Sequence, residues 1–290
     1  MQRVLVAGAT GYLGGFVAQE FKARGYLVRA LARSPEKLDH VQGSLDEIVE
    51  AEVTLPETLE HICDGIDVVF SSIGITRQKD GLTFRDVDYQ GNKNLLEVAL
   101  RAGAKKFIYV SVFNGPNLLR LDIVRAHEDF VDELKASEID YAVLRSTGYF
   151  SDMGEFLEMA KKGRVYLIGR GDNRGNPIHG ADLAVACADA VEAEETEIDV
   201  GGPEVLAYRE IAELAFRSLG KPARITVVPE WVMGLVVGLA KIFSRHQGEL
   251  LAFFTTAMTR DVVAPAVGVH RLVDHFENLA STDQKRRGTK

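Results

Sequence analysis

The chain has 290 residues, with 42 acidic against 34 basic side chains and a formal net charge of −8. Its hydrophobic share of 46% and charged share of 26% are ordinary for a globular protein and exclude a disordered or collagen-like chain. The acidic balance argues against nucleic acid as a partner, because sequence-independent binding needs a basic surface. Cys63 and Cys187 are too few for a disulfide framework, so we expect a reducing, cytoplasmic compartment.

Strand and helix segments alternate over the first two-thirds of the chain. Strands are predicted at residues 3–7, 27–32, 47–52, 67–71, 106–111 and 141–145. Helices are predicted at residues 14–24, 57–61, 87–102 and 123–137. Because these strands are apolar along their whole length, they fit a sheet that is covered on both faces. The sequence therefore predicts an α/β fold, a doubly wound parallel sheet of the Rossmann type.

The pattern loosens after Arg145. Gly169–Asn176 is predicted to be a surface loop, and Asp182 the N-cap of a helix that runs to Val191. Beyond a break at Gly201-Gly202-Pro203, a helix at 208–219, a strand at 224–228 and two or three further helices are expected. We predict a Rossmann domain at 1–204, a small, mainly helical C-terminal substrate cap at 205–282 and a flexible tail at 283–290.

The segment most similar to a membrane element is Trp231–Ala240. It is shorter than the ~20 apolar residues that a span needs, and Glu230 and Lys241 flank it. Its length favours a buried helix or a subunit-contact helix, as in a homo-oligomer, over membrane contact.

The strongest motif is the glycine-rich turn between the first strand and the first helix. Glycine allows a sharp turn and lets a phosphate approach the main chain, and the helix start offers unpaired N–H groups to a pyrophosphate. Strand before, helix after and the position at the start of the chain favour a dinucleotide site over a simple tight turn. The predicted cofactor-binding residues of this turn are Gly8, Thr10, Gly11, Tyr12, Leu13 and Gly14.

The end of the second strand indicates which dinucleotide binds. NAD-binding sheets place an acid about 20 residues after the glycines to hold the ribose 2′-hydroxyl. Here Arg33 lies 19 residues after Gly14, and Lys37 adds a second positive charge. A guanidinium binds a 2′-phosphate through two hydrogen bonds, so NADP(H) is predicted over NAD(H), the alternative being a solvated surface arginine.

The fold predicts further cofactor contacts where the other strands end. Each could also be only a polar strand end. These candidates are Glu52, Val53, Ser71, Ser72, Ile73, Gly74, Ser111, Thr147 and Gly148.

Taken together, these motifs resemble the atypical, extended branch of the short-chain dehydrogenase/reductase superfamily, in its NmrA-like and isoflavone-reductase-like neighbourhood. The resemblance covers residues 1–205, and the segment beyond it is similar, more loosely, to the cap of divinyl-chlorophyllide-reductase-like members. The matching segments are Gly8–Gly14, Arg33–Lys37, Asp67–Ser72, Asp88–Asn92, Ala104–Ser111, Ile139–Arg145 and Ile178–Ala184.

The resemblance implies an NADP-dependent oxidoreductase, but the sequence departs from the superfamily's catalytic Tyr-x-x-x-Lys pair. Ile123 and His127 occupy the aligned positions, and an aliphatic side chain transfers no proton. NmrA-like regulators bind the dinucleotide without turnover. Two interpretations therefore stay open: an NADPH-dependent reductase of a small apolar or aromatic molecule, and a catalytically silent NADP(H)-binding sensor or assembly protein.

Four side chains are candidates for chemistry. His127 could serve as general acid, hydrogen-bond the ribose or merely pack, while its neighbour Glu128 is expected to be solvated. Tyr89, Tyr149 and Asn114 could line the cleft, or be packed or solvated residues. His179 is expected to be a loop histidine, and no set of side chains has the spacing of a metal site.

Overall fold

The computed structural model describes residues 1–75 and 81–288, and these divide into two compact units. The first unit comprises residues 1–146 and 183–199, and the second comprises 147–182 and 200–290. The predicted boundary at residue 204 is therefore wrong. After the sixth strand the chain enters the second unit, returns to the sheet through one helix and one strand, and leaves again. The sequence argument assumed two contiguous domains.

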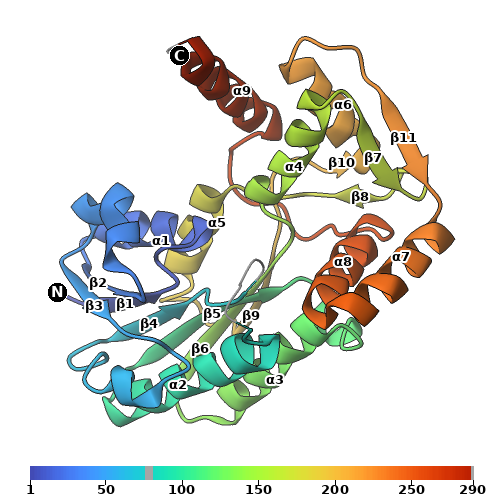
Figure 1. The fold of residues 1–290 in the computed structure, drawn as a ribbon. Helices are drawn as coiled ribbons and strands as arrows, with labels where there is room; N and C mark the ends of the chain where they lie inside the picture. Colours follow the sequence, from blue (N-terminus) through green and yellow to red (C-terminus); the bar gives the residue numbers. More distant parts are fainter. Residues whose placement is uncertain (76–80, 289–290) are drawn as a thin grey trace. The chain divides into compact units, whose positions relative to one another are not determined.

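A seven-stranded sheet forms the centre of the first unit, in the order β3-β2-β1-β4-β5-β6-β9 (Figure 1). The paired strands for which the register is defined are parallel, which confirms the doubly wound class. The strands are β1 (Arg3–Ala7), β2 (Leu27–Ala32), β3 (Glu47–Glu50), β4 (Val68–Ser71), β5 (Lys106–Val112), β6 (Asp140–Ser146) and β9 (Glu197–Val200).

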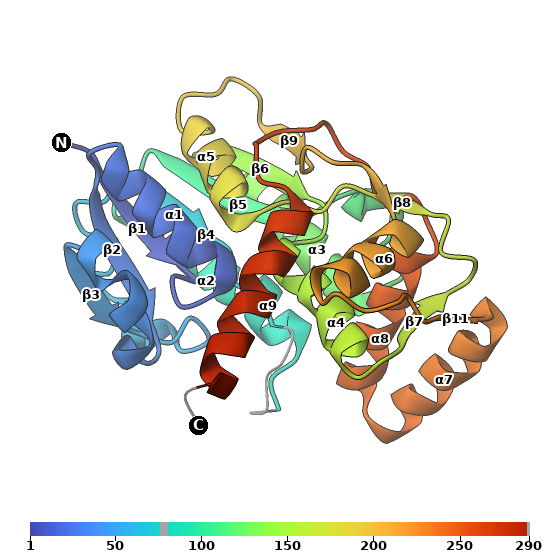
Figure 2. The same cartoon turned by 90° about the horizontal axis from the view of Figure 1, so that it is seen from above.

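Helices cover both faces of this sheet (Figures 1 and 2). One face carries α1 (Tyr12–Ala23) and α5 (Gly180–Asp189), and an ion pair of 2.7 Å between Arg24 and Asp189 joins their ends. The other face carries α2 (Asn92–Arg101) and α3 (Asp122–Ala136). Their apolar side chains complete a core with the sheet, in which Leu95 and Phe130 are fully buried. Short turns of 3₁₀ helix are η1 (Pro35–Ser44), η2 (Pro56–Leu59) and η4 (Gly115–Asn117).

The predicted helix at 87–102 is split in two. A π-helical segment, η3 (Arg85–Gly91), precedes α2. Its wider turn brings Gly91 against β3's outgoing chain, where an added Cβ would lie 2.8 Å from a methyl group of Val53. Wide turns of this kind cannot be recognised from a 3.6-residue apolar pattern, and they occur often at functional sites.

The second unit has its own apolar core. Helices α4 (Phe150–Lys161), α6 (Tyr208–Ser218) and α9 (Leu272–Gly288) bury Phe156, Phe216 and Phe276. Two small sheets pair β7 (Val165–Ile168) with β11 (Ile225–Val228), and β8 (Arg174–Gly175) with β10 (Leu206–Ala207). Where the sequence predicts a loop over 169–176, β8 therefore intervenes. Where it predicts a flexible tail, α9 continues to Gly288.

The remaining helices of this unit form a hairpin, α7 (Glu230–Phe243) followed by α8 (Arg245–Met258). None of the residues of α7 is buried, and Trp231 and Phe243 are 70% and 87% exposed. The prediction of a buried helix is thus wrong for a single copy of the chain, in which α8 packs along α7 (Figure 2). Within residues 1–75 and 81–288, no helix has both the length and the hydropathy to cross a membrane.

Asp182 does not act as the predicted N-cap. It lies in the first turn of α5, where Oδ2 accepts hydrogen bonds from the backbone N–H groups of Val269 and His270 at 3.1 and 3.0 Å. Oδ1 lies 2.7 Å from Nδ1 of His270. Gly268 is required there, since a Cβ would lie 2.1 Å from the carboxyl carbon of Asp182. The Asp182 carboxylate therefore holds the distant segment around Val269 and His270 in place instead of capping its own helix.

Three histidines gather beside this carboxylate. The rings of His179 and His270 stack with centroids 4.3 Å apart, and the ring of His275 lies 6.0 Å from His179. Burial lowers the pKa of His179 to about 4, helped by His270 and His275 and opposed by Asp182. Burial also lowers the pKa of His275. Burial thus favours the uncharged form of His179 and His275.

We expect the protein to lose stability as the pH falls from about 6.5 towards 4. An unfolded histidine with a pKa near 6.5 binds a proton in this window while folded His179 does not, so acid favours the unfolded state. Thermal melts from pH 7.5 to 4.5 measure the decline. His179→Asn keeps an acceptor for the backbone N–H of Ala181 and should flatten it, whereas His61→Asn, at an exposed site, should not. Equal slopes in wild type and His179→Asn would contradict the prediction.

Candidate functional site

The glycine-rich turn after β1 has the geometry of a phosphate cradle. Gly8 has a φ of +92°, and the N–H of Gly11 donates to its carbonyl oxygen at 2.9 Å. An added Cβ on Gly14 would lie only 2.1 Å from that same oxygen. Gly11 is the N-cap of α1 and brings no side chain to cap the first helical N–H groups. The turn therefore leaves main-chain donors and the positive end of a helix dipole available to an anion.

A pocket of about 300 Å³ opens beside this turn, at the carboxyl ends of β1, β2, β3 and β4. Nine of the predicted cofactor residues line it, namely Gly8, Thr10, Gly11, Arg33, Glu52, Val53, Ser72, Ile73 and Gly74. The sequence reasoning missed four further residues of its wall, which are Leu31, Ala32, Ile75 and Val87. These four are apolar, and nothing in their pattern separates a strand or helix residue that faces a ligand from one that faces the core.

The polar rim of the pocket is formed by two opposite charges. Arg33 ends β2 and is 53% exposed, and its guanidinium lies 3.3 Å from the carboxylate of Glu52. Glu52 also accepts a hydrogen bond of 3.1 Å from the Thr54 hydroxyl. A guanidinium fork at this position can bind a phosphate, and an adjacent carboxylate can accept from an amine. Lys37 is exposed on η1 and is not among the pocket-lining residues.

The side chains of several other predicted contact residues have partners within the chain. Tyr12 and Leu13 begin α1, where Leu13 is buried and the Tyr12 ring packs on Phe16. Ser71 is fully buried and donates a hydrogen bond of 2.5 Å to Asn92. Asn92 in turn donates to the carbonyl oxygen of Ile73, so this pair holds the pocket's floor after β4. The sequence motif contained Asn92, but no pattern assigned it this role.

The second unit contains Thr147, Gly148 and Tyr149, whereas the glycine-rich turn belongs to the first unit. The Thr147 hydroxyl donates to the carbonyl oxygen of Asn176 at 2.6 Å. Tyr149 directly precedes α4, and its N–H donates to Asp152. Their predicted roles at the nicotinamide and in catalysis stay predictions.

Tyr89 is not among the residues that line the pocket. Its hydroxyl donates a hydrogen bond of 2.6 Å to Glu133 on α3, and the guanidinium of Arg85 lies over its ring at 4.5 Å. The hydrogen bond to Glu133 is the main cause that raises the pKa of Tyr89. A phenol already bonded to a carboxylate, and with a raised pKa, is a poor proton donor to a substrate. Asn114 is exposed in the left-handed region at φ +59° and bonds Asn117.

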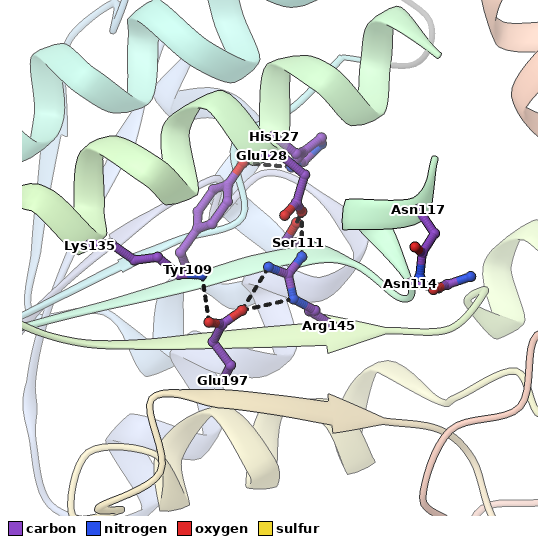
Figure 3. A network of polar contacts seen from close by, with 9 residues as sticks. All are labelled: Tyr109, Ser111, Asn114, Asn117, His127, Glu128, Lys135, Arg145 and Glu197. Atoms are coloured by element: carbon purple, nitrogen blue, oxygen red, sulfur yellow. Dashed lines mark hydrogen bonds and ion pairs between the residues drawn. The ribbon is translucent and has the colours of Figure 1, made fainter. Parts of the chain in front are cut away.

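His127 contacts two residues that the sequence reasoning did not connect with it. Its Nδ1 lies 2.6 Å from the Tyr109 hydroxyl (Figure 3), and its Nε2 lies 3.3 Å from Oδ1 of Asp88. Its side chain is 12% exposed. The position that the sequence analysis aligned with the superfamily's lysine is thus occupied by a ring that contacts a tyrosine hydroxyl and a buried carboxylate.

Glu128 is buried, and the expectation that it is solvated is wrong. Its carboxylate pairs with Arg145 on β6 and accepts a hydrogen bond of 2.9 Å from Ser111 (Figure 3). Arg145 is bound on its other side by Glu197, which also pairs with Lys135 at 2.6 Å. Ser111 is therefore engaged by Glu128, and the whole group ties α3 to β5, β6 and β9. The charge pattern of an amphipathic helix could not reveal a partner on a strand.

Comparisons with known proteins agree with the interpretation of this pocket as a dinucleotide site. The family described as NAD(P)H-binding matches residues 8–194. The divinyl chlorophyllide a 8-vinyl-reductase of Arabidopsis thaliana is 33% identical over 83% of this chain, which spans 64% of that relative's length. The photosystem II assembly factor Ycf39 of Synechocystis is 29% identical over 87% of this chain and 78% of its own.

A solved structure shows the same fold. The leucoanthocyanidin reductase–NADPH complex from Vitis vinifera has a TM-score of 0.78 at 19% identity, covering 96% of this chain and 99% of its own. The looser likeness to divinyl-chlorophyllide-reductase-like proteins is confirmed by the relatives. The family match covers more than half of the chain and contains the glycine turn, Arg33 and three of the strands at the pocket, β2, β3 and β4. The chain therefore belongs to the NAD(P)H-binding family.

Proposed function

We propose that this protein is an NADPH-dependent reductase of a small apolar or aromatic molecule, an atypical short-chain dehydrogenase/reductase that works without the Tyr-x-x-x-Lys pair. The carrying observation is the pocket, which joins a glycine cradle at the start of α1 to a guanidinium at the end of β2. Bound NADPH would supply the hydride. The chain would contribute position and a proton donor. The two free, buried thiols, Cys63 and Cys187, are consistent with a reducing, cytoplasmic setting.

The preference for NADPH over NADH rests on Arg33. No carboxylate follows β2 at the position where it would bind the 2′-hydroxyl and repel a 2′-phosphate. The Glu52 carboxylate holds the guanidinium on the pocket rim at 3.3 Å and can release it to a dianionic phosphate.

Replacing Arg33 with alanine is expected to weaken NADPH binding by roughly 10- to 100-fold, because hydrogen bonds to a charged group contribute about 1.5–3 kcal/mol. NADH binding should stay nearly constant, since NADH lacks the phosphate. Fluorescence titration of both dinucleotides measures the change. Arg33→Lys should fall between the two, because an ammonium keeps the charge without the fork. Tighter NADH than NADPH binding by wild type would refute the proposed preference.

The reductase activity is tested by NADPH oxidation with quinones, enones, isoflavonoids and a divinyl chlorophyllide, the last because relatives are named for it. Oxidation dependent on one acceptor, and lost in the Arg33→Ala variant at limiting NADPH, is the expected result.

A catalytically silent sensor or assembly protein is the second candidate. It is favoured by Ile123 and His127 in place of the catalytic pair and by the likeness to an assembly factor. Tight NADPH binding with no oxidation by any acceptor would support it and would exclude the reductase.

A further inference from the structure

A chain of three polar side chains connects the core of the first unit to the pocket wall. The hydroxyl of Tyr109, on β5, lies 2.6 Å from Nδ1 of His127, on α3. Nε2 of the same ring lies 3.3 Å from Oδ1 of Asp88, on η3. With the ring proton on Nε2, Nδ1 accepts from the tyrosine and Nε2 faces the carboxylate. The two neighbours thus select one orientation of the imidazole.

Asp88 is the unusual member of this chain. It is fully buried, and its Oδ2 accepts a hydrogen bond of 3.2 Å from the N–H of Ile75. Among the described residues, no aligned hydrogen bond reaches Oδ1, so the contact with His127 is an ion-pair distance only. Burial raises the pKa of Asp88, and His127 opposes this. A buried carboxyl with one unsatisfied oxygen is costly unless it shares a proton with a neighbour.

The pair lies close to residues that line the pocket. Gly74, Ile75 and Val87 line the pocket, and Val87 directly precedes Asp88. A Cβ on Gly74 would lie 3.0 Å from Oδ1 of Asp88 and 3.7 Å from Nε2 of His127. Gly74, a residue of the pocket wall, thus lies directly beside Asp88 and His127.

We propose that Asp88 is the positioning residue of a proton-donating pair with His127, which takes the place of the missing Tyr-x-x-x-Lys. The inference rests on the proposed reductase function. Bound NADPH would give the acceptor a hydride and become NADP⁺, and the imidazolium form of His127, facing the Asp88 carboxylate, would give the one proton that completes the reduction and become neutral. The pair then recovers a proton from water. Oδ1 of Asp88 and Nε2 of His127 lie 3.3 Å apart, close enough for the carboxylate to hold the ring in place for this transfer.

Asp88→Asn tests this role, because the amide keeps the shape and removes the shared charge. We expect NADPH oxidation at pH 7 to slow by about 100-fold or more, with NADPH affinity changed by less than about threefold. The pH profile of the rate should lose or shift its His127 limb. Asp86→Asn is the matched control: Asp86 is an exposed carboxylate two residues earlier on the same segment, bonded to Thr83, and its removal should leave rate and profile unchanged.

A second variant separates a working pair from two independent residues. If Asp88 acts through His127, Asp88→Asn combined with His127→Gln should be no slower than His127→Gln alone. Losses that multiply, or an Asp88→Asn rate profile identical in shape to that of wild type, would overturn the proposal and leave Asp88 a structural residue.

A measurement that does not depend on turnover tests the pairing of Asp88 and His127 separately from the reductase activity. Ring ¹⁵N shifts of His127, assigned by their loss in His127→Gln, should follow pH differently in Asp88→Asn and in wild type. Unchanged shifts would refute the pairing even in an active enzyme. A coupled titration in a protein that binds NADPH but reduces no acceptor would refute the donor role and the reductase together, while the pairing itself would stand.

Discussion

Replacing Gly14 with alanine is expected to abolish tight NADPH binding and to destabilise the first unit. The new Cβ would lie 2.1 Å from the carbonyl oxygen of Gly8 and 2.8 Å from Cα of Ala9, and both contacts are backbone atoms that cannot rotate away. The turn must open, which moves the amides at the start of α1 from their cradle geometry. We expect at least a 100-fold loss of NADPH affinity, since displaced hydrogen bonds to a charged group contribute about 1.5–3 kcal/mol each. We also expect the free energy of unfolding to fall by ~1–3 kcal/mol because of the overpacking strain.

Gly43→Ala is the matched control for this substitution. Gly43 lies in η1, and no atom is found within 4 Å of the position of its Cβ. Its replacement should leave NADPH affinity and the melting temperature nearly unchanged. Fluorescence titration and thermal melts measure both variants. Normal NADPH affinity in Gly14→Ala would show that the turn is not the phosphate site.

The sequence predicted this turn and its flanks closely because they depend on local rules. The predicted limits of β1 and β2 coincide with those observed, and the glycines lie where a strand meets a helix. An apolar strand and an amphipathic helix can each be recognised from the pattern of a few residues. The pocket residues at the ends of β2 and β4 followed from the same reasoning, since parallel strands present their carboxyl ends at one edge.

Contacts between distant segments were not predictable in this way. The partner of Tyr89 is 44 residues away, on a helix whose rotation no pattern fixes. Asp182 binds residues 87 and 88 positions further along the chain, so its N-cap pattern was overridden by a tertiary contact. The domain boundary failed for the same reason, because a return of the chain to a sheet leaves no mark in composition.

Glu128 is the clearest case of a charge that the sequence misplaces and the fold explains. It follows His127 on a helix whose polar residues are mostly solvated, yet a strand residue, Arg145, neutralises it in the interior. Gly115 makes room for the pair, as a Cβ there would lie 2.3 Å from a carboxylate oxygen of Glu128. Three segments that are far apart in the chain, η4, α3 and β6, thus come together around one buried ion pair.

Arg145→Met is expected to destabilise the protein by about 3–5 kcal/mol, because it leaves the carboxylate of Glu128 buried without its cation. The side chains of Arg145 and Glu128 are only 5% and 9% exposed, so water cannot replace the lost partner. Glu197 is less affected, since it is 37% exposed and keeps Lys135. Urea unfolding followed by circular dichroism measures the loss as a lower midpoint at constant slope.

Two further variants test whether the loss of stability arises from the burial of the ion pair or only from the removal of one positive charge. Arg85→Met breaks the exposed ion pair with Asp129, 65% and 37% exposed, and should cost at most about 1 kcal/mol. Adding Glu128→Gln to Arg145→Met should recover part of the loss, because the unpaired charge is then gone. If Arg145→Met and Arg85→Met were equally mild, the Glu128–Arg145 pair would not stabilise the attachment of α3 to the sheet.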